Sequence, residues 1–271
     1  MSYKNALIAE ENTKRILAQL QRLTPGDAIS HNARIKAYPN GLLRYTLCSK
    51  PVFKDPGYEL ADNYGQPLSD NAAPKSSPKN MDNPSRGDSV KRSKEKVFDI
   101  AMMNDFNWFV TWTLSPKKIN RYSPDEVSKK VKQFLNDMVK RYDLRYVLIP
   151  EHHKDGAIHM HGLMSGNMKL VDSGKHTLSG KTIYNMSQWK YGWSTVIPTY
   201  GETDHVARYI TKYITKDFSK IFGNYYYAGG NITRTPIIHR ADIDYADINT
   251  KEYLIDGLNI GYKYLTVPNT D

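Results

Sequence analysis

The sequence contains very little cysteine and no long apolar run. Cys48 is the only cysteine among the 271 residues, so a disulfide within the chain and a zinc site built from several cysteines are both impossible. This scarcity fits a reducing cytosol. No window approaches the roughly 18 consecutive apolar residues that a transmembrane helix needs, and the N-terminus lacks the pattern of a signal peptide. We therefore expect a soluble, cytoplasmic protein with no membrane partner.

Acidic residues are fewer than basic ones. The chain contains 38 Lys plus Arg against 28 Asp plus Glu, a formal charge of +10. This balance favours a polyanionic partner, with nucleic acid first and an anionic membrane second. A basic protein without such a partner fits the charge about equally well. The 20 tyrosines can stack on unpaired bases or serve ordinary cores and strands.

Composition and periodicity divide the chain into four segments. An amphipathic helix is predicted over residues 4–23, and short strands over 31–54 around the PNG turn. The second segment is rich in Asn, Pro, Ser and Lys, which predicts a flexible polar linker. The segments are an N-terminal helix and strands (1–60), a linker (61–96), a main domain (97–224) and a Tyr-rich C-terminal extension (225–271).

The main domain alternates strand and helix patterns. Its order, β–α–β–β–(β)–α, predicts an α+β fold with a split βαβ, ferredoxin-like antiparallel sheet and helices on one face. The third predicted strand returns directly from the second, so the two form a hairpin. The predicted strands are 107–116, 145–151, 158–164 and 189–198, and the predicted helices are 123–142 and 203–218.

The hairpin carries a possible metal site in the stretch IHMHG. In a strand, His159 and His161 share a face and Met160 takes the other. Glu151 ends the incoming strand and would lie across from them. Two neutral imidazoles and one carboxylate can hold a divalent ion with open coordination positions, which suits catalysis. Polar residues on a wet hairpin explain the same pattern about equally well. The turn holds further candidates that it can carry outward, His152, His153 and Asp155.

The last predicted helix contains the second constellation, YITKYITKD. Tyr209 and Tyr213 are four residues apart and share a face, with Lys212 and Lys216 on its flank. A phenol with a pKa of about 10 is a weak nucleophile. Neighbouring cations and a metal-polarised phosphate would lower the barrier to its attack. The alternative is that the tyrosines pack on the sheet and the lysines are solvated.

Together these motifs resemble those of rolling-circle replication initiators (Rep proteins) of the HUH endonuclease superfamily. FVTWTLSP is similar to the first family motif, and IHMHGLM matches the His–hydrophobic–His motif. YITKYITKD matches the Tyr-x-x-Lys-Tyr motif in the two-tyrosine form of phage and plasmid initiators. The resemblance covers residues 98–220. Trp112 is bulkier than the pattern suggests, and we expect it to face the helices while Thr111 and Thr113 face the metal.

The resemblance implies a role for each motif. His159, His161 and Glu151 would bind Mg²⁺ or Mn²⁺, although histidine ligands would equally suit Zn²⁺. Tyr209 or Tyr213 would attack a phosphate of single-stranded origin DNA, forming a 5′-phosphotyrosyl link and a 3′-OH that primes synthesis. Lys212 and Lys216 would stabilise the phosphate charge or orient the phenols. The predicted DNA-contacting residues are Thr111, Thr113, Trp112, Trp189, Trp193 and Arg208, with core packing as the alternative for the tryptophans.

The resemblance also implies partners. No P-loop of the form G-x-x-x-x-G-K-[ST] follows the tyrosine helix, so a separate helicase and the replication machinery of a bacterial host cell are expected to act with the protein. The alternatives are a relaxase or transposase of the same superfamily, a basic DNA-binding protein that does not cut, and a histidine-dependent phosphohydrolase that does not use the tyrosines.

Overall fold

A computed structural model describes residues 30–53, 85–200, 203–215, 220–241, 252–255 and 258–266. The contacts divide the chain into two compact units. One contains the described residues before position 54 together with those from 236 onward, and the other contains the described residues from 85 to 235. The C-terminal segment that the sequence treats as one extension is thus shared between the two units.

The first unit contains a five-stranded antiparallel sheet with the order β10-β1-β2-β12-β11. Strands β1 and β2 form a hairpin whose turn has Gly41 at φ +83°, a region that glycine adopts without steric cost. The strands predicted over 31–54 are therefore confirmed, whereas the helix predicted over 4–23 lies outside the described residues. The bounds are Ser30–Ala37 (β1), Leu42–Phe53 (β2), Ile237–Ala241 (β10), Glu252–Ile255 (β11) and Leu258–Thr266 (β12).

A helix begins inside the segment that the sequence predicts as a linker. Helix α2 spans Ser85–Met103, so the prediction of a linker over 61–96 is wrong from residue 85 onward. Val90, Val97 and Ala101 are buried at helical spacing, while most of the residues between Val90 and Val97 are at least partly exposed. The polar composition therefore reflects one side of a helix. Within the part of the chain that the structure describes, no helix is long and apolar enough to cross a membrane.

The second unit contains a seven-stranded antiparallel sheet with the order β6-β7-β8-β3-β5-β4-β9. The predicted strands that correspond to β3, β4, β5 and β8 are confirmed, and β4 and β5 form the expected hairpin. The hairpin of β6 and β7 and the short strand β9 were not predicted. The bounds are Trp108–Leu114 (β3), Arg145–His152 (β4), Ile158–Ser165 (β5), Leu170–His176 (β6), Thr182–Met186 (β7), Gly192–Pro198 (β8) and Tyr227–Gly229 (β9).

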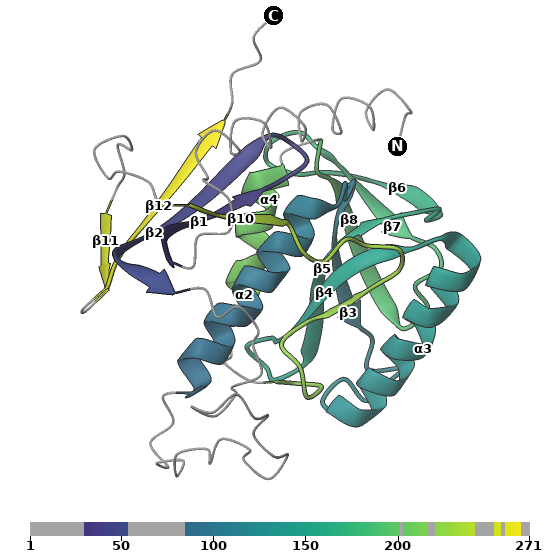
Figure 1. Cartoon of the computed structure of the whole chain (residues 1–271). Coiled ribbons are helices and arrows are strands. Elements are labelled where there is room, and N and C mark those ends of the chain that lie inside the picture. Colours follow the sequence, from purple (N-terminus) through teal and green to yellow (C-terminus); the bar gives the residue numbers. More distant parts are fainter. Residues whose placement is uncertain are drawn as a thin grey trace, which may run out of the picture. The chain divides into compact units, whose positions relative to one another are not determined.

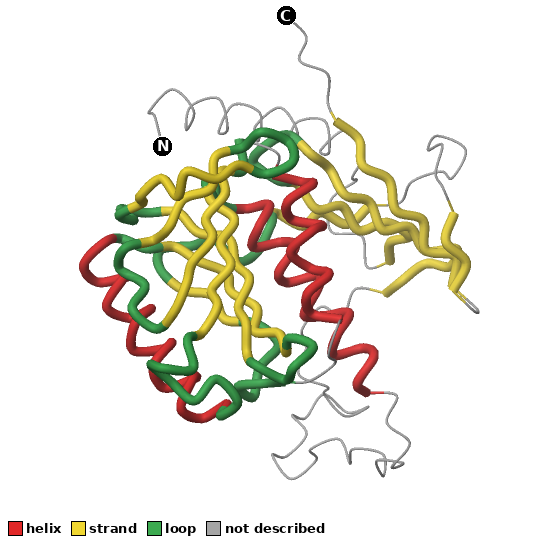
Figure 2. The backbone as a smooth tube through the Cα atoms, turned by 180° about the vertical axis from the view of Figure 1, so that it is seen from behind, coloured by secondary structure: helices red, strands yellow, loops and turns green. Residues whose placement is uncertain are grey.

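Helices cover both faces of this sheet (Figures 1 and 2). Helix α3, Pro124–Tyr142, packs on the face that contains Trp112 and Met160, whereas α4, Thr203–Thr211, lies on the face of His161. Helix α2 lies against α4. The predicted α+β class is confirmed, but the expectation that all helices share one face is wrong, because both faces of the sheet carry apolar side chains that a helix can bury.

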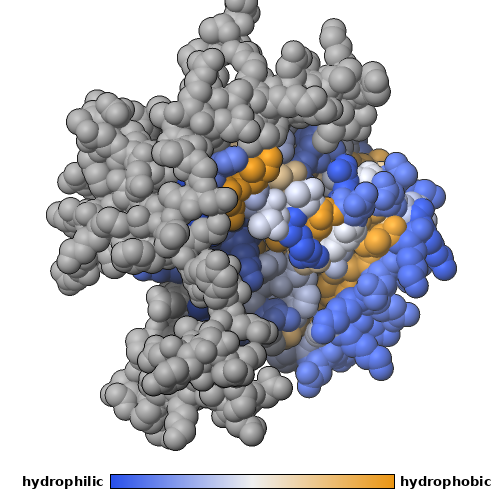
Figure 3. Space-filling model, in the orientation of Figure 1, coloured by the Kyte–Doolittle hydropathy of each residue, from blue (hydrophilic) through white to orange (hydrophobic). Residues whose placement is uncertain are grey.

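Helix α3 begins where the sequence predicts. The Oγ atom of Ser123 accepts a hydrogen bond from the backbone N–H of Glu126, and Pro124 occupies the first turn. The surface over α3 in Figure 3 is mainly hydrophilic, as expected for the outer side of an amphipathic helix. The buried stripe consists of Val127, Val131, Leu135 and Met138.

The core beneath α3 is built around two tryptophans. The rings of Trp112 and Trp189 stack with centroids 4.3 Å apart and planes 10° from parallel. The ring of Phe134, from α3, meets both edge-on at 5.3 and 5.1 Å. Trp112 is fully buried, so the expectation that it faces a helix is confirmed. Aromatic contacts of this kind fix how α3 lies on β3.

Candidate functional site

The strand register aligns four polar or aromatic residues across the sheet. His159 on β5 lies opposite Glu151 on β4 and opposite Thr113 on β3, and Thr113 lies opposite Trp193 on β8. Residues that are directly paired in antiparallel strands share a face. The row therefore runs from Trp193 through Thr113 and His159 to Glu151. The hairpin register that the sequence predicts is the one observed.

His161, in the next row, is held from two sides. Its Nε2 atom lies 2.9 Å from Oε2 of Glu151, and its Nδ1 atom lies 3.2 Å from Oγ1 of Thr111. The side chains of His161 and Glu151 are only 13 % and 11 % exposed, so water screens their interaction weakly. The Thr111 hydroxyl can accept a proton from Nδ1 or donate one to it. His161 can therefore present Nε2 either as a donor to Glu151 or as a bare lone pair.

A glycine brings β5 close to β4 beside this pair. A Cβ atom on Gly162 would lie 2.8 Å from the carbonyl oxygen of Val147 and 2.9 Å from a methyl carbon of Leu148. Real Cβ atoms do not approach backbone oxygens this closely, so a larger residue at 162 would push the two strands apart. The glycine that follows the second histidine thus serves the pairing that brings Glu151 to His161.

The tyrosines reach this face from α4 and the 3-10 helix η1, which spans Lys212–Thr215. Ala207, Ile210 and Ile214 are buried and form the apolar seam of this segment. The helix predicted over 203–218 is confirmed through residue 215, and residues 216–219 lie outside the described residues. Tyr209 and Tyr213 project beside the seam, so the segment packs with one side and presents two phenols with another.

Tyr213 lies directly against the histidine motif. Its ring stacks on His161 with centroids 3.8 Å apart and planes 16° from parallel. Its hydroxyl donates a hydrogen bond of 2.9 Å to the Tyr209 hydroxyl, and the Tyr209 side chain is exposed. Burial, followed by this hydrogen bond, raises the pKa of Tyr213 above the ordinary value of about 10. Tyr213 therefore holds its proton firmly in this arrangement.

Phe109 links the tyrosines to the sheet. Its ring centroid lies 5.4 Å from that of Tyr209, 6.3 Å from that of Tyr213 and 6.4 Å from that of His161. Sequence reasoning placed Phe109 in a strand but assigned it no role. The signal was its spacing of two from Thr111, which places both residues on one face.

The predicted cations have different surroundings. The Nζ atom of Lys212 lies 5.7 Å from the ring centroid of Tyr209, on the tyrosine side of the segment as expected. Lys216 lies outside the described residues. Arg208 forms an ion pair of 3.2 Å with Asp204 one turn earlier in α4. Only Lys212 among these three is thus observed beside a candidate nucleophile.

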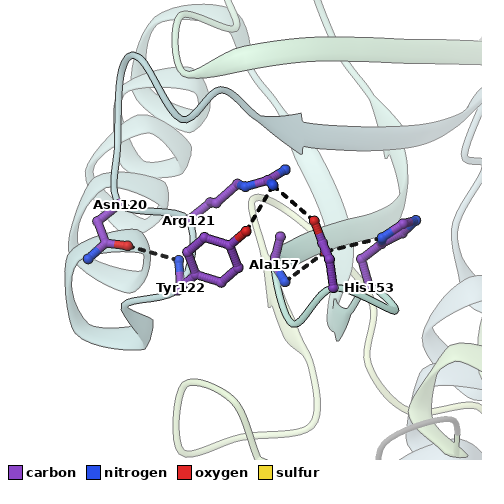
Figure 4. Close-up of polar contacts among 6 residues, drawn as sticks. Asn120, Arg121, Tyr122, His153 and Ala157 are labelled. Carbon is purple, nitrogen blue, oxygen red and sulfur yellow. Dashed lines mark hydrogen bonds and ion pairs between the residues drawn. The ribbon is translucent and has the colours of Figure 1, made fainter.

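The turn between β4 and β5 contains a second polar cluster (Figure 4). The carboxylate of Asp155 accepts a hydrogen bond of 3.1 Å from the backbone N–H of Ala157 and lies 3.2 Å from Nδ1 of His153. Its other oxygen lies 2.9 Å from Nη2 of Arg121. The ring of His153 stacks on His159 at 4.8 Å, with planes 17° from parallel. Arg121 was not singled out from the sequence, because it lies 34 residues before its partner and belongs to no motif.

This cluster perturbs two titrating groups. The N–H of Ala157, together with His153 and Arg121, lowers the pKa of the Asp155 carboxyl. Burial, followed by the nearby His153, lowers the pKa of His159. His159 is therefore neutral around pH 7, and the neutral imidazole is the form that binds metals. The turn residues, which the sequence ranks below the main ligands, contact His159 through the ring of His153.

The three tryptophans predicted to contact DNA divide into two groups. Trp112 and Trp189 are buried in the core beneath α3 and expose no ring face to a DNA base. The core-packing alternative thus describes both rings. Trp193 is 62 % exposed and lies in the same row as His159. Trp193 is therefore placed where an unpaired base could stack beside the candidate site.

The candidate metal ligands are partly assembled. His161 and Glu151 are paired, and His159 projects from the same face two residues away. Within the described residues, no group of three or more His, Cys, Asp or Glu side chains is arranged to hold a metal ion as it stands. The donor chemistry of two imidazoles and one carboxylate fits a divalent ion.

A comparison with known protein families finds a match within the second unit. Residues 107–218 match the family model of replication-associated proteins of the ORF2 type. The matched segment covers less than half of the chain and contains both histidines, Glu151 and both tyrosines. No match to the chain was found among curated proteins or among solved structures. The family match supports a role in DNA replication and, through that role, an interaction with DNA.

Proposed function

We propose that this protein initiates rolling-circle DNA replication by cutting single-stranded origin DNA with a tyrosine, as HUH endonucleases do. One observation carries the proposal. Tyr213 stacks on His161, and His161 pairs with Glu151, so a candidate nucleophile and two candidate metal ligands are in direct contact. The match of residues 107–218 to a replication-associated family supports the same function.

His159, His161 and Glu151 would hold the divalent ion, for which we propose Mg²⁺ or Mn²⁺, with Zn²⁺ as the alternative that imidazole ligands also suit. When bound, such an ion would neutralise and polarise the scissile phosphate. The Thr111 hydroxyl would accept the Nδ1 proton of His161 and leave the Nε2 lone pair available. The protein thus supplies donors whose orientation is fixed before the substrate arrives.

The tyrosine would exchange one phosphodiester for another. The phenol oxygen forms a bond to phosphorus while the bond from phosphorus to the 3′ oxygen breaks. The phenol loses its proton, and the 3′ oxygen gains one. The products are a 5′-phosphotyrosyl link and a free 3′-OH that primes synthesis. Because the new bond conserves the energy of the old one, a later attack by a 3′-OH can rejoin the strand without ATP.

The arrangement of the two phenols favours Tyr209 for the first cut. Tyr209 is the exposed ring, and its oxygen accepts the hydrogen bond from Tyr213. Tyr213 is more buried, and its raised pKa makes its proton harder to remove. Tyr213 would then cut the junction that replication regenerates. Comparison of single Tyr→Phe variants tests the order, since Tyr209→Phe should slow the first cut more than Tyr213→Phe.

Other residues would bind the strand rather than react. Lys212, and by the same motif Lys216, would stabilise charge on the phosphate beside the phenols. Trp193, with its exposed ring, would stack on an unpaired base. Thr113 and Arg208 would contact the strand at the edges of this face. A separate helicase and host replication proteins would complete the reaction.

A covalent adduct assay tests the proposal. Single-stranded oligonucleotides that tile the replicon carrying this gene are incubated with the protein and Mg²⁺ or Mn²⁺, then run on a denaturing gel. We expect a protein–DNA adduct that disappears with EDTA and with Tyr209→Phe/Tyr213→Phe. A basic DNA-binding protein that does not cut would bind the oligonucleotides without metal and give no adduct. A phosphohydrolase would cut and be indifferent to the tyrosine variant.

A further inference from the structure

A polar cavity of about 440 Å³ lies in the second unit, between α2 and the segment 220–234. Ser93 and Lys96 line it from α2, and Lys220, Tyr226 and Arg234 line it from the other side. Its volume falls in the range of roughly 300–1,000 Å³ that is typical of small-ligand sites. No role in the proposed chemistry accounts for this cavity.

The lining carries positive charge without a compensating carboxylate. Lys96, Lys220 and Arg234 line the cavity, and no Asp or Glu is among its described lining residues. The Nη2 atom of Arg234 donates a hydrogen bond of 2.7 Å to the carbonyl of Ala228, which holds the guanidinium at the rim. The Nζ atom of Lys220 lies 5.3 Å from the ring centroid of Tyr225. An anion is the ligand that this charge complements.

One tyrosine of the lining offers an aromatic surface beside these cations. Tyr226 is half-buried, and burial raises the pKa of its phenol, so the ring stays neutral. Tyr227 is engaged elsewhere, because its hydroxyl donates to the carbonyl of Phe222 at 2.6 Å and its ring faces Lys132 of α3. Tyr226 is therefore the ring on which a planar ligand would stack.

The cavity opens on the same side of the sheet as the histidines. Ala228 on β9, which also lines the cavity, lies opposite Val147 on β4. Val147 is four residues before Glu151, so their side chains share a face. The two positions are about 13 Å apart along the strand. A single strand of DNA that passes Glu151 can therefore also reach the cavity.

We propose that this cavity binds one unpaired nucleotide of the DNA strand on which the protein acts. The phosphate would lie among Lys96, Lys220 and Arg234, and the base would stack on Tyr226. An anionic group beside a planar ring describes a nucleotide, and the position one strand beyond Glu151 selects a nucleotide of the bound strand. The inference rests on the proposed function, because that function brings single-stranded DNA to this face.

Binding without cutting tests the inference. The full chain with Tyr209→Phe/Tyr213→Phe is titrated, in EDTA, against a fluorescein-labelled oligothymidylate, and anisotropy is read at several salt concentrations. Lys96→Gln is compared with Lys129→Gln, which removes an equally exposed charge from α3 on the opposite face. We expect Lys96→Gln to weaken binding and lower the slope of log affinity against log salt by about 0.7, with Lys129→Gln unchanged. Equal effects of the two variants would overturn the inference.

The stacking role is tested separately. Tyr226→Ala should weaken binding by about 5- to 100-fold, whereas Tyr226→Phe and Tyr226→Trp should bind like the parent. Equal losses for all three variants would contradict stacking. Competition by thymidine monophosphate at the concentration at which the oligonucleotide saturates would mean that the cavity is a free-nucleotide site, which also overturns the proposal. If Lys96→Gln lacks these effects while the adduct still forms, the inference alone fails. If no adduct forms but both pocket effects appear, the proposed nicking fails and the inference stands.

Discussion

The two faces of the seven-stranded sheet are built from alternate residues of the same strands, yet they differ in kind. On the α3 side, Trp112 and Met160 are fully buried in a continuous apolar core. On the α4 side, the neighbours Thr111 and His161 are only partly buried and hydrogen-bonded. The comparison teaches that one face specifies the fold and the other places reactive groups. Substitutions on the two faces should therefore have separable effects on stability and on chemistry.

The largest separation is expected for the histidine pair. His159→Ala/His161→Ala should lower adduct formation by at least about a thousandfold, because it removes two of the three proposed metal ligands. The melting temperature should change little, since neither ring is part of the core. The measurement is the rate of adduct formation on a denaturing gel alongside a thermal melt. Unchanged cleavage with unchanged metal dependence would remove the metal site from this hairpin.

The reverse separation is expected for the tryptophans. Trp112→Ala should lower the free energy of unfolding by about 3–5 kcal/mol, because it opens a cavity within the stack of Trp189 and Phe134. Trp193→Ala, on the other face, should change it by no more than about 0.5 kcal/mol, as exposed positions usually do. Urea unfolding measures both variants. Similar losses for the two would show that the faces are not separable.

A smaller effect is expected for the residue that orients His161. Thr111→Val keeps the shape of the side chain but removes the hydroxyl beside Nδ1. We expect the metal concentration for half-maximal cutting to rise about 10- to 100-fold, the range typical of residues that orient metal ligands. Thr111→Ser should restore it. A change in the maximal rate alone, with unchanged metal dependence, would contradict this role.

The smallest effect concerns the turn of Figure 4. The pKa of Asp155 is lowered in the folded state, so its carboxylate favours folding above its unfolded pKa of about 3.9, and that contribution is lost as the pH falls through the lower folded pKa. Asp155→Asn should therefore melt slightly below the wild type near neutral pH. The gap should close in acid. A gap that grows on acidification would contradict the assignment.

Local patterns predicted much of the second unit. The cap of α3, the hairpin register and the His–Tyr motifs depend on residues close in sequence or on simple alternation, and the structure has them where expected. The face that each helix covers depends on packing between distant segments, so the expectation of one covered face was wrong. The partners of His159 could not be foreseen either, because the stacking of His153 depends on the geometry of the turn.

The central claim is that a tyrosine of α4 or η1 becomes linked to DNA beside the histidine pair. The most direct measurement digests the adduct with protease and nuclease and locates the nucleotide-bearing residue by mass spectrometry. The account predicts a nucleotide on Tyr209 or Tyr213, with Tyr209 first at short times, and none in EDTA. A nucleotide on any other residue, or cut DNA with no linked peptide, would contradict it.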